Sequence, residues 1–221
     1  LRGELENRSV MQVAAGTAHT IFVTTDGLVY ACGQNYKGQL GVGGTKERLV
    51  PTLVTGQLQG KTAVYVAAGE HHTLCITEDG SFLSWGRNGS GQLGVGDTED
   101  RHVPTLVTGL QGKRVVHVAA GEYHTICSTA DGSVFTWGGG YYGTLGLGDD
   151  KSARLLPTLV RGELQGKQVV QVTAGDRHSA CVTKDSSVYV WGNNDEVQLG
   201  QEDMDDASLP VLVRGLTPMP V

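Results

Sequence analysis

Val66-Ala67-Ala68-Gly69-Glu70-His71-His72-Thr73 is one of four versions of an octapeptide that decides the fold of this chain. The related stretches begin at Val13, Val118 and Val172, and the shared glycines are separated by 53, 52 and 54 residues. Other landmarks keep this period, namely Leu-Gly pairs at 40–41, 93–94, 145–146 and 199–200, and prolines at 51, 104, 157 and 210. Such internal repetition is the signature of an array of similar structural units.

The sequence of each repeat predicts short β-strands. In the second copy, residues 62–68, 73–77 and 81–85 are rich in β-branched and aromatic residues and are too short for stable helices. Asp79-Gly80 lies between the second and third of these stretches, and Asp-Gly in such a place predicts a type I′ hairpin turn. In the fourth copy Asp185-Ser186 takes its place and is a poorer turn sequence.

A fourth strand follows a glycine-rich loop in each unit. We expect Pro104 to open this strand in the second copy and to keep it at a sheet edge, because proline cannot donate to a ladder. One four-stranded unit cannot bury both of its faces, so neighbouring units must stack as the blades of a propeller do. Ala67 and Ala68 fit the crowded inner end of a blade, and Trp85 fits the wider outer part.

The predicted fold class is therefore all-β: a β-propeller of four-stranded blades, with four repeats of about 53 residues. We take residues 1–221 as part of a single propeller, with blades at approximately 4–56, 57–109, 110–162 and 163–216.

Composition excludes several other classes. The 221 residues include 33 glycines without a strict period of three and only 6 prolines, which excludes collagen. Hydrophobic residues make up 39% and the net charge is −6, which does not fit a disordered chain. There is no apolar stretch long enough to span a membrane, and an acidic chain is not expected to bind nucleic acid directly. We therefore expect an intracellular protein, cytoplasmic or nuclear.

The repeated pattern Val-Ala-Ala-Gly-x-x-His-Thr, Asp-Gly, Trp-Gly, Gly-Gln-Leu-Gly and Pro resembles the regulator of chromosome condensation repeat over essentially the whole chain. The resemblance implies a propeller that closes with seven blades, of which this chain supplies four. The ring then needs further blades or a second chain to close it. An open arc would expose two apolar blade flanks, so we expect the 221 residues alone to associate.

Residues that recur in every copy are expected to be structural. His19, His72, His124 and His178 share one position, where we expect each ring to satisfy a buried backbone group. Trp85, Trp137 and Trp191 likewise share one position, and Cys32 replaces them in the first copy. Cys75, Cys127 and Cys181 are expected to be small apolar core residues; the chain has no Cys-x-x-Cys pair, which argues against zinc and suits a reducing compartment. We expect no catalytic residue, metal or cofactor.

Function is expected where the copies differ. The two residues between the repeated Gly and His include three carboxylates near one rim of the central channel, which suggests an electronegative surface for a basic partner. Tyrosines in the long loops add aromatic groups that binding surfaces often use. The candidate partner-binding residues are Glu70, Glu122, Asp176, Tyr123, Arg177, Tyr36, Tyr141 and Tyr142.

The favoured function is a non-enzymatic module that binds a protein partner through its loops and rim. The resemblance offers an alternative, guanine-nucleotide exchange on a Ran-type small GTPase, although the even repeat spacing leaves no room for the projecting β-wedge of the family's founder. The family that the chain resembles also includes a UV-B receptor that relies on clustered tryptophans. The corresponding positions here hold other residues, so no such cluster is expected: Ala18, His71, Tyr123 and Arg177. No basic run supports binding to chromatin.

Overall fold

Four antiparallel sheets account for nearly all of the regular structure. The computed structural model describes residues 5–148 and 150–216, and sixteen strands lie in these ranges. The first sheet contains β1 (Val10–Ala15), β2 (His19–Thr24), β3 (Val29–Gly33) and β4 (Arg48–Leu53). The second contains β5 (Ala63–Ala68), β6 (His72–Thr77), β7 (Phe82–Gly86) and β8 (Arg101–Leu106).

The remaining two sheets repeat this plan. The third contains β9 (Val115–Ala120), β10 (His124–Thr129), β11 (Val134–Gly138) and β12 (Arg154–Leu159). The fourth contains β13 (Val169–Ala174), β14 (His178–Thr183), β15 (Val188–Gly192) and β16 (Ala207–Leu212). The helical turns that the structure describes are the 3₁₀ segments η1 (Gly56–Leu58), η2 (Tyr141–Gly143) and η3 (Gly162–Leu164).

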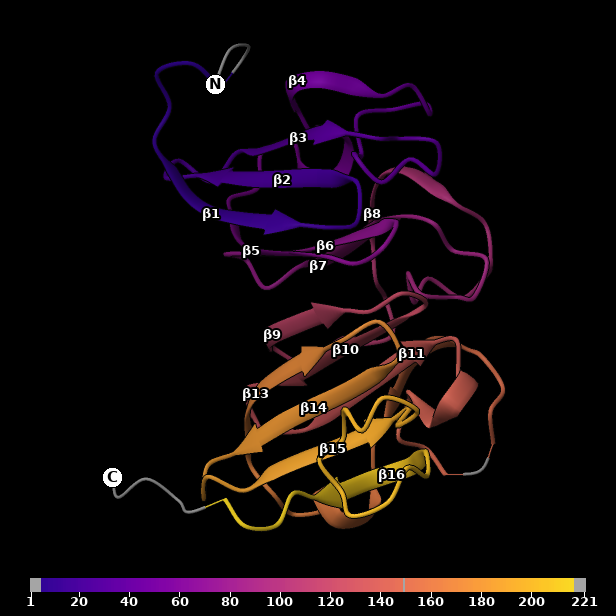
Figure 1. The fold of residues 1–221 in the computed structure, drawn as a ribbon. Helices are drawn as coiled ribbons and strands as arrows, with labels where there is room; N and C mark the ends of the chain where they lie inside the picture. Colours follow the sequence, from indigo (N-terminus) through magenta and orange to yellow (C-terminus); the bar gives the residue numbers. More distant parts are fainter. Residues whose placement is uncertain (1–4, 149, 217–221) are drawn as a thin grey trace.

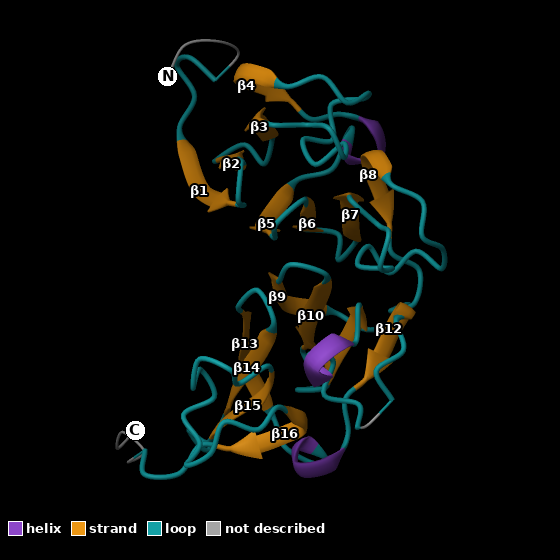
Figure 2. Cartoon of the chain, turned by 45° about the vertical axis from the view of Figure 1, so that its right-hand side comes forward, coloured by secondary structure: helices purple, strands orange, loops and turns teal. Residues whose placement is uncertain are grey.

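The sheets are the blades of a β-propeller, and they form an open arc rather than a closed ring (Figures 1 and 2). The first strands of successive blades, β1, β5, β9 and β13, contact one another along the inner edge of the arc. Each blade is a meander, so its strand order in space follows its order in the chain. The turns between the first and second strands and the loops between the third and fourth strands therefore share one end of every blade, which we call the loop face.

Apolar clusters fill the spaces between blades. Val66 of the second blade packs in one cluster with Ile21 and Val23 of the first, and Val118 packs with Leu74 of the blade before it. The buried cysteines lie in these clusters, and burial raises the pKa of the Cys75 thiol to about 12. The core is thus divided into layers between blades, and each blade is stabilised mainly by its neighbours.

The hairpin turns differ from the type I′ prediction, which is wrong. Among the described residues, the Asp-Gly turns have positive φ at the glycine alone, for example +80° at Gly80. Gly80 N donates to the Thr77 carbonyl at 2.9 Å, while Thr77 N bonds the Ser81 carbonyl at 3.0 Å. This pattern fits a three-residue turn that ends in a left-handed glycine, in which only the last position needs positive φ. In the fourth blade Ser186 takes that position at +64°.

The prolines also lie elsewhere in their strands than predicted. β8 begins at Arg101, three residues before Pro104, and residues 102–104 pair with no residue of β7 because the register shifts between Ser84 and Gly86. The proline therefore occupies an irregularity in an outer edge strand, where its missing N–H breaks no ladder bond.

Candidate functional site

The repeated histidine, hydroxyl and tryptophan form one joint between neighbouring blades. His19 Nε2 lies 3.0 Å from Thr73 Oγ1 of the next blade, and the Thr73 hydroxyl donates to the Gln39 carbonyl at 2.8 Å. Trp85 Nε1 donates to the same carbonyl at 3.0 Å. The joint recurs with His72, Thr125, Trp137 and the Gln92 carbonyl, and with His124, Ser179, Trp191 and the Thr144 carbonyl.

These contacts fix the proton on each histidine. The hydroxyl proton is committed to a carbonyl, so the hydroxyl accepts from a protonated Nε2. Burial lowers the pKa of His19 to about 4, of His72 to about 3 and of His124 to about 4, so the rings are neutral at pH 7. The spacing resembles a nucleophile–base pair, but a nitrogen that already carries the proton cannot act as the base.

One expectation about the joint differs from the structure. The histidines were expected to satisfy backbone groups, but the ring reaches a hydroxyl, which then bonds a backbone carbonyl. The Gln39 carbonyl accepts from both the Thr73 hydroxyl and Trp85 Nε1, and the hydroxyl links it to the histidine ring. Trp85 lies on β7, the third strand outward from the inner strand β5, and it is fully buried between blades, where it contacts the loop of the blade before it.

The octapeptide glycine is required by the same joint. A Cβ on Gly69 would lie 2.5 Å from the Gly121 carbonyl of the next blade and 2.6 Å from Cε1 of His72. Gly16 and Gly121 are crowded in the same way. Only glycine lets the inner ends of the blades approach this closely.

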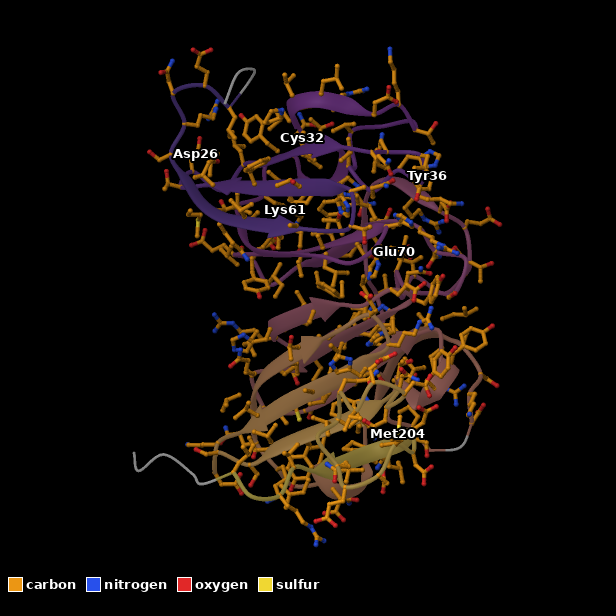
Figure 3. All side chains as sticks on the ribbon, in the orientation of Figure 1. Asp26, Cys32, Tyr36, Lys61, Glu70 and Met204 are labelled. Atoms are coloured by element: carbon orange, nitrogen blue, oxygen red, sulfur yellow. The ribbon has the colours of Figure 1, made fainter. Side chains whose placement is uncertain are left out.

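Residues that break the repeat gather on the loop face, and Figure 3 shows Tyr36 and Glu70 at that end of the strands with Asp26 at the other. Tyr36 of the first blade reaches the second, where its hydroxyl lies 2.7 Å from His71 Nε2 and the rings meet edge to face. His71 Nε2 is also 3.2 Å from a Glu70 oxygen. Two of the predicted partner-binding residues are therefore joined through His71.

Arginines continue this network across the next two blades. Arg87 lies 3.7 Å from Glu70 and its guanidinium stands 4.8 Å from the centre of the Tyr123 ring. Arg177 bonds Glu122 at 2.9 Å and stands 5.4 Å from the centre of the Tyr142 ring. Such cation–ring contacts and ion pairs hold side chains of five turns and loops in one surface.

The network also sets the charge of its members. Burial opposes ionisation of Glu122, but hydrogen bonds from Tyr123 and Arg177 outweigh it and lower the pKa of the carboxyl. The hydrogen bond to Glu122 raises the pKa of Tyr123, and the same carboxylate raises the pKa of Arg177. Glu122 is therefore a carboxylate at neutral pH and neutralises Arg177.

The structure brings the candidate residues to one face but adds two members that sequence reasoning missed. Arg87 and His71 connect Tyr36, Glu70 and Tyr123. Arg87 follows a Trp-Gly pair where the other copies have Gln34, Gly139 and Asn193, so its variation between copies was the available signal. His71 varies in the same way.

The acidic loop of the fourth blade is partly structural. Asp206 Oδ1 accepts from Asn194 N at 3.0 Å, and Asp195 Oδ2 accepts from the Asn193 side chain at 3.0 Å. Within the part of the chain that the structure describes, no three histidine, cysteine, aspartate or glutamate residues are placed to hold a metal ion. No described helix is long and apolar enough to cross a membrane.

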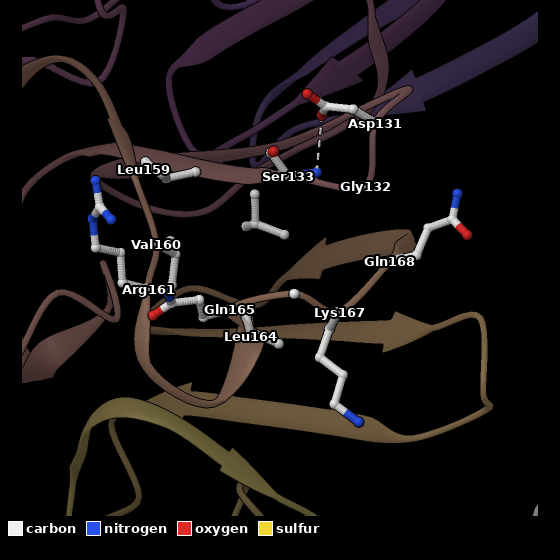
Figure 4. Close-up of a pocket in the computed structure, with 12 residues that line it drawn as sticks. Asp131, Gly132, Ser133, Leu159, Val160, Arg161, Leu164, Gln165, Lys167 and Gln168 are labelled. Atoms are coloured by element: carbon white, nitrogen blue, oxygen red, sulfur yellow. Dashed lines mark hydrogen bonds between the residues drawn. The ribbon is translucent and has the colours of Figure 1, made fainter.

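A cavity of about 280 Å³ opens at the other end of the third blade, shown in Figure 4. It lies between the hairpin turn 131–134 and the link 159–168, and Ser133 N donates to Asp131 Oδ1 at 3.1 Å. Arg161 and Lys167 are its charged walls beside Asp131. Because a similar turn and link recur in the other blades, the cavity follows from the repeat and we assign no ligand to it.

Comparison with known families and proteins matches this architecture. Residues 2–165 match the model of the RCC1-like domain, and residues 169–198 and 185–221 match models of the regulator of chromosome condensation (RCC1) repeat. The chain is 40% identical over 214 residues to the human E3 ubiquitin-protein ligase HERC2, covering 96% of this chain and 4% of HERC2. It is 36% identical to the Arabidopsis thaliana ultraviolet-B receptor UVR8, covering 96% of this chain and 48% of the receptor.

A solved structure supports the same relationship. Prp20p from Saccharomyces cerevisiae, described together with its binding properties to Gsp1p and histones, superposes with a TM-score of 0.83 at 27% identity. The match covers 95% of this chain and 51% of that one. The chain thus spans about half the length of UVR8 and of Prp20p, and a small fraction of HERC2.

Proposed function

Since this chain belongs to the regulator of chromosome condensation repeat family, we propose that it is a non-enzymatic module that binds a protein partner through its loop face. The supporting observation is a division of labour among its side chains. The repeated histidines and glycines, with the tryptophans of three blades, join the blades, whereas side chains that differ between copies form a connected surface.

The chemistry of that surface suits a protein. Tyr36 and Tyr141 expose 50% and 64% of their area, and exposed tyrosines beside paired charges are typical of protein-binding surfaces. The net charge of −6 gives no support for a direct nucleic-acid ligand.

Variants that keep the joints intact test this proposal. The double variant Tyr36→Ala/Tyr141→Ala should lose the proteins that the unaltered protein retains from a cell extract, because both rings are exposed and absent from the joints. The matched control is Leu49→Ala/Lys113→Ala, which alters an outer strand and the opposite end of the blades. If the loop-face variant still retained these proteins, or if the control variant lost them, the binding surface would lie elsewhere on the molecule.

Nucleotide exchange on a Ran-type GTPase is the second candidate, and similarity to Prp20p, which is described with its binding to Gsp1p, favours it. Against it, every strand among the described residues belongs to a blade, so these blades carry no projecting β-wedge. We expect the protein not to accelerate GDP release from a Ran-type GTPase. If the protein accelerated GDP release, nucleotide exchange would replace protein binding as the proposed primary function.

A further inference from the structure

A pocket of about 140 Å³ opens on the loop face between the third and fourth blades. Tyr141, Tyr142 and Thr144 of the third blade line it on one side, and Asp176 and Arg177 of the fourth line it on the other. Its volume is of the order that one long side chain occupies. The pocket therefore has the size of an anchor site rather than of a site for a whole peptide.

The pocket arises where the third copy departs from the repeat. Gln39 and Gln92 are fully buried at the loop position that Thr144 takes in the third blade. In addition, Gly139 and Gly140 replace Arg87 and Asn88 of the second copy. Gly139 and Thr144 line the pocket, so two of these truncations on one loop leave space at its wall, whereas a side chain at Gly140 would face the Lys151 and Ser152 carbonyls of its own loop.

The loop face shows what this kind of site binds. Glu70 and the Tyr123 ring together hold the guanidinium of Arg87, and Glu122 and the Tyr142 ring hold that of Arg177. A carboxylate beside a tyrosine face thus binds a guanidinium twice within this molecule, by ion pairing and by attraction to the ring.

Asp176 and Tyr141 both line the pocket and bring the same two kinds of group to it, a carboxylate and a tyrosine ring. Asp176 forms no ion pair with a described residue, and Tyr141 makes no described ring contact. Arg177 in the pocket wall does not repel a second cation strongly, because Glu122 neutralises it at 2.9 Å. The pocket therefore has an unpaired negative charge next to an exposed aromatic ring.

We propose that this pocket binds an arginine side chain of the protein partner, with the guanidinium against Tyr141 and the Asp176 carboxylate. This inference rests on the proposed function, since it names the group that the loop face recognises. Arginine fits better than an apolar side chain because a guanidinium can pair with the Asp176 carboxylate that lines the pocket, and an apolar group cannot.

N-acetyl-arginine amide is the probe, and its neutral isostere N-acetyl-citrulline amide is the control. We expect the arginine probe to shift the backbone amide resonances of Tyr142, Thr144 and Arg177 in a saturable manner, and citrulline to bind at least about tenfold more weakly. Asp176→Asn should remove this difference between the probes. Thr144→Gln, which restores the residue of the other blades, should abolish both shifts, while Glu202→Gln, outside the pocket, should change neither.

Absence of saturable shifts, equal affinity for the two probes, or undiminished binding to Asp176→Asn would overturn the inference. If Thr144→Gln disturbs folding, Asp176→Asn still provides a valid test, because the Asp176 side chain takes no part in a joint. A partner that loses binding to Tyr36→Ala/Tyr141→Ala but binds Thr144→Gln and Asp176→Asn normally would refute the pocket and leave the proposed function standing.

Discussion

Position 69 requires glycine because of the backbone of the next blade. Its missing Cβ leaves room for the Gly121 carbonyl, which would otherwise be 2.5 Å away. The neighbouring backbone belongs to a packed strand end and cannot move aside alone. The glycine excess in this sequence therefore includes positions set by packing between blades as well as by turns.

Gly69→Ala should destabilise the protein by about 1–3 kcal/mol, the usual cost of forcing an extra group into a packed site. Gly89→Ala is the matched control, because its Cβ would meet no atom within 4 Å and its φ is not positive. Urea unfolding followed by circular dichroism measures both. Equal stability of the two variants would show that the joint tolerates the extra group.

The buried histidines predict how stability depends on pH. Their folded-state pKa values of about 3 to 4 lie below the ordinary value of 6.5, so the unfolded chain binds more protons between those values. Stability is therefore fully present above pH 6.5 and declines as the pH falls, with a slope of up to about 1.4 kcal/mol per pH unit for each histidine.

Chemical unfolding between pH 7 and 4.5 should show this decline, and His72→Gln should reduce its slope by the share of one histidine. The depressed pKa values of Asp79 and the other hairpin aspartates act at lower pH and do not mask it. A pH-independent stability over this range would contradict neutral, buried rings.

At the scale of the element, the hairpins of the blades depend on one left-handed residue each. Gly27, Gly80 and Gly132 supply it in the first three blades, and Ser186 supplies it in the fourth at φ +64°. A serine pays a steric cost there that glycine avoids.

Ser186→Gly should therefore stabilise the fourth blade by up to about 1 kcal/mol, and Gly80→Ser should destabilise the second by a similar amount. A Cβ on Gly80 would meet no atom within 4 Å, so this pair isolates the backbone effect. Thermal unfolding of the two variants checks it, and shifts of the same sign would refute the account of the turn.

The elements were predictable to the extent that they rest on local pattern. Short stretches rich in β-branched and aromatic residues, with Asp-Gly signals between them, predicted the strands of each blade, but the predicted turn geometry was wrong because Asp-Gly serves more than one hairpin type. The start of β8 was also missed, since Arg101 and His102 look like loop residues and only Arg101 pairs with β7, opposite Gly86 beyond a register shift. Pairing across strands cannot be deduced from one strand's composition.

At the scale of the whole molecule, the blades leave two unlike flanks. Val13 in β1 is 54% exposed, whereas its equivalents Val66 and Val118 are 1% and 2% exposed against a preceding blade. At the other flank, His178 is only partly buried, and the equivalent rings bond a hydroxyl of a following blade. The flank of the first blade therefore has the surface that packs against a preceding blade, and the flank of the fourth blade has the surface that packs against a following blade.

We therefore expect the 221 residues alone to associate through these flanks, because exposed apolar faces of this kind drive assembly. Light scattering of the purified chain should give a mass above 23.3 kDa. Val13→Lys should reduce the association, while Val64→Lys, at a half-exposed position of the second blade, should not. A stable monomer would show that the arc needs no neighbour.

The sequence predicted part of the membership of the candidate site, but not its contacts. Comparison of the four copies identified Tyr36, Glu70 and Arg177 as departures from the repeat, but not that Arg87 would bridge Glu70 and Tyr123. The pocket beside Thr144 was missed because it results from side chains that are absent. Contacts between blades at this site join residues from 35 positions apart, as for Tyr36 and His71, to 55, as for Glu122 and Arg177, and spacing alone does not say which long side chains will meet.

Site-specific photo-crosslinking tests the central claim most directly. A photoreactive phenylalanine analogue at Tyr141, on the loop face, should form a covalent adduct with the partner, and the same group at Lys113, at the opposite end of the blades, should not. Adducts from Lys113 without adducts from Tyr141 would contradict a partner-binding role for the loop face.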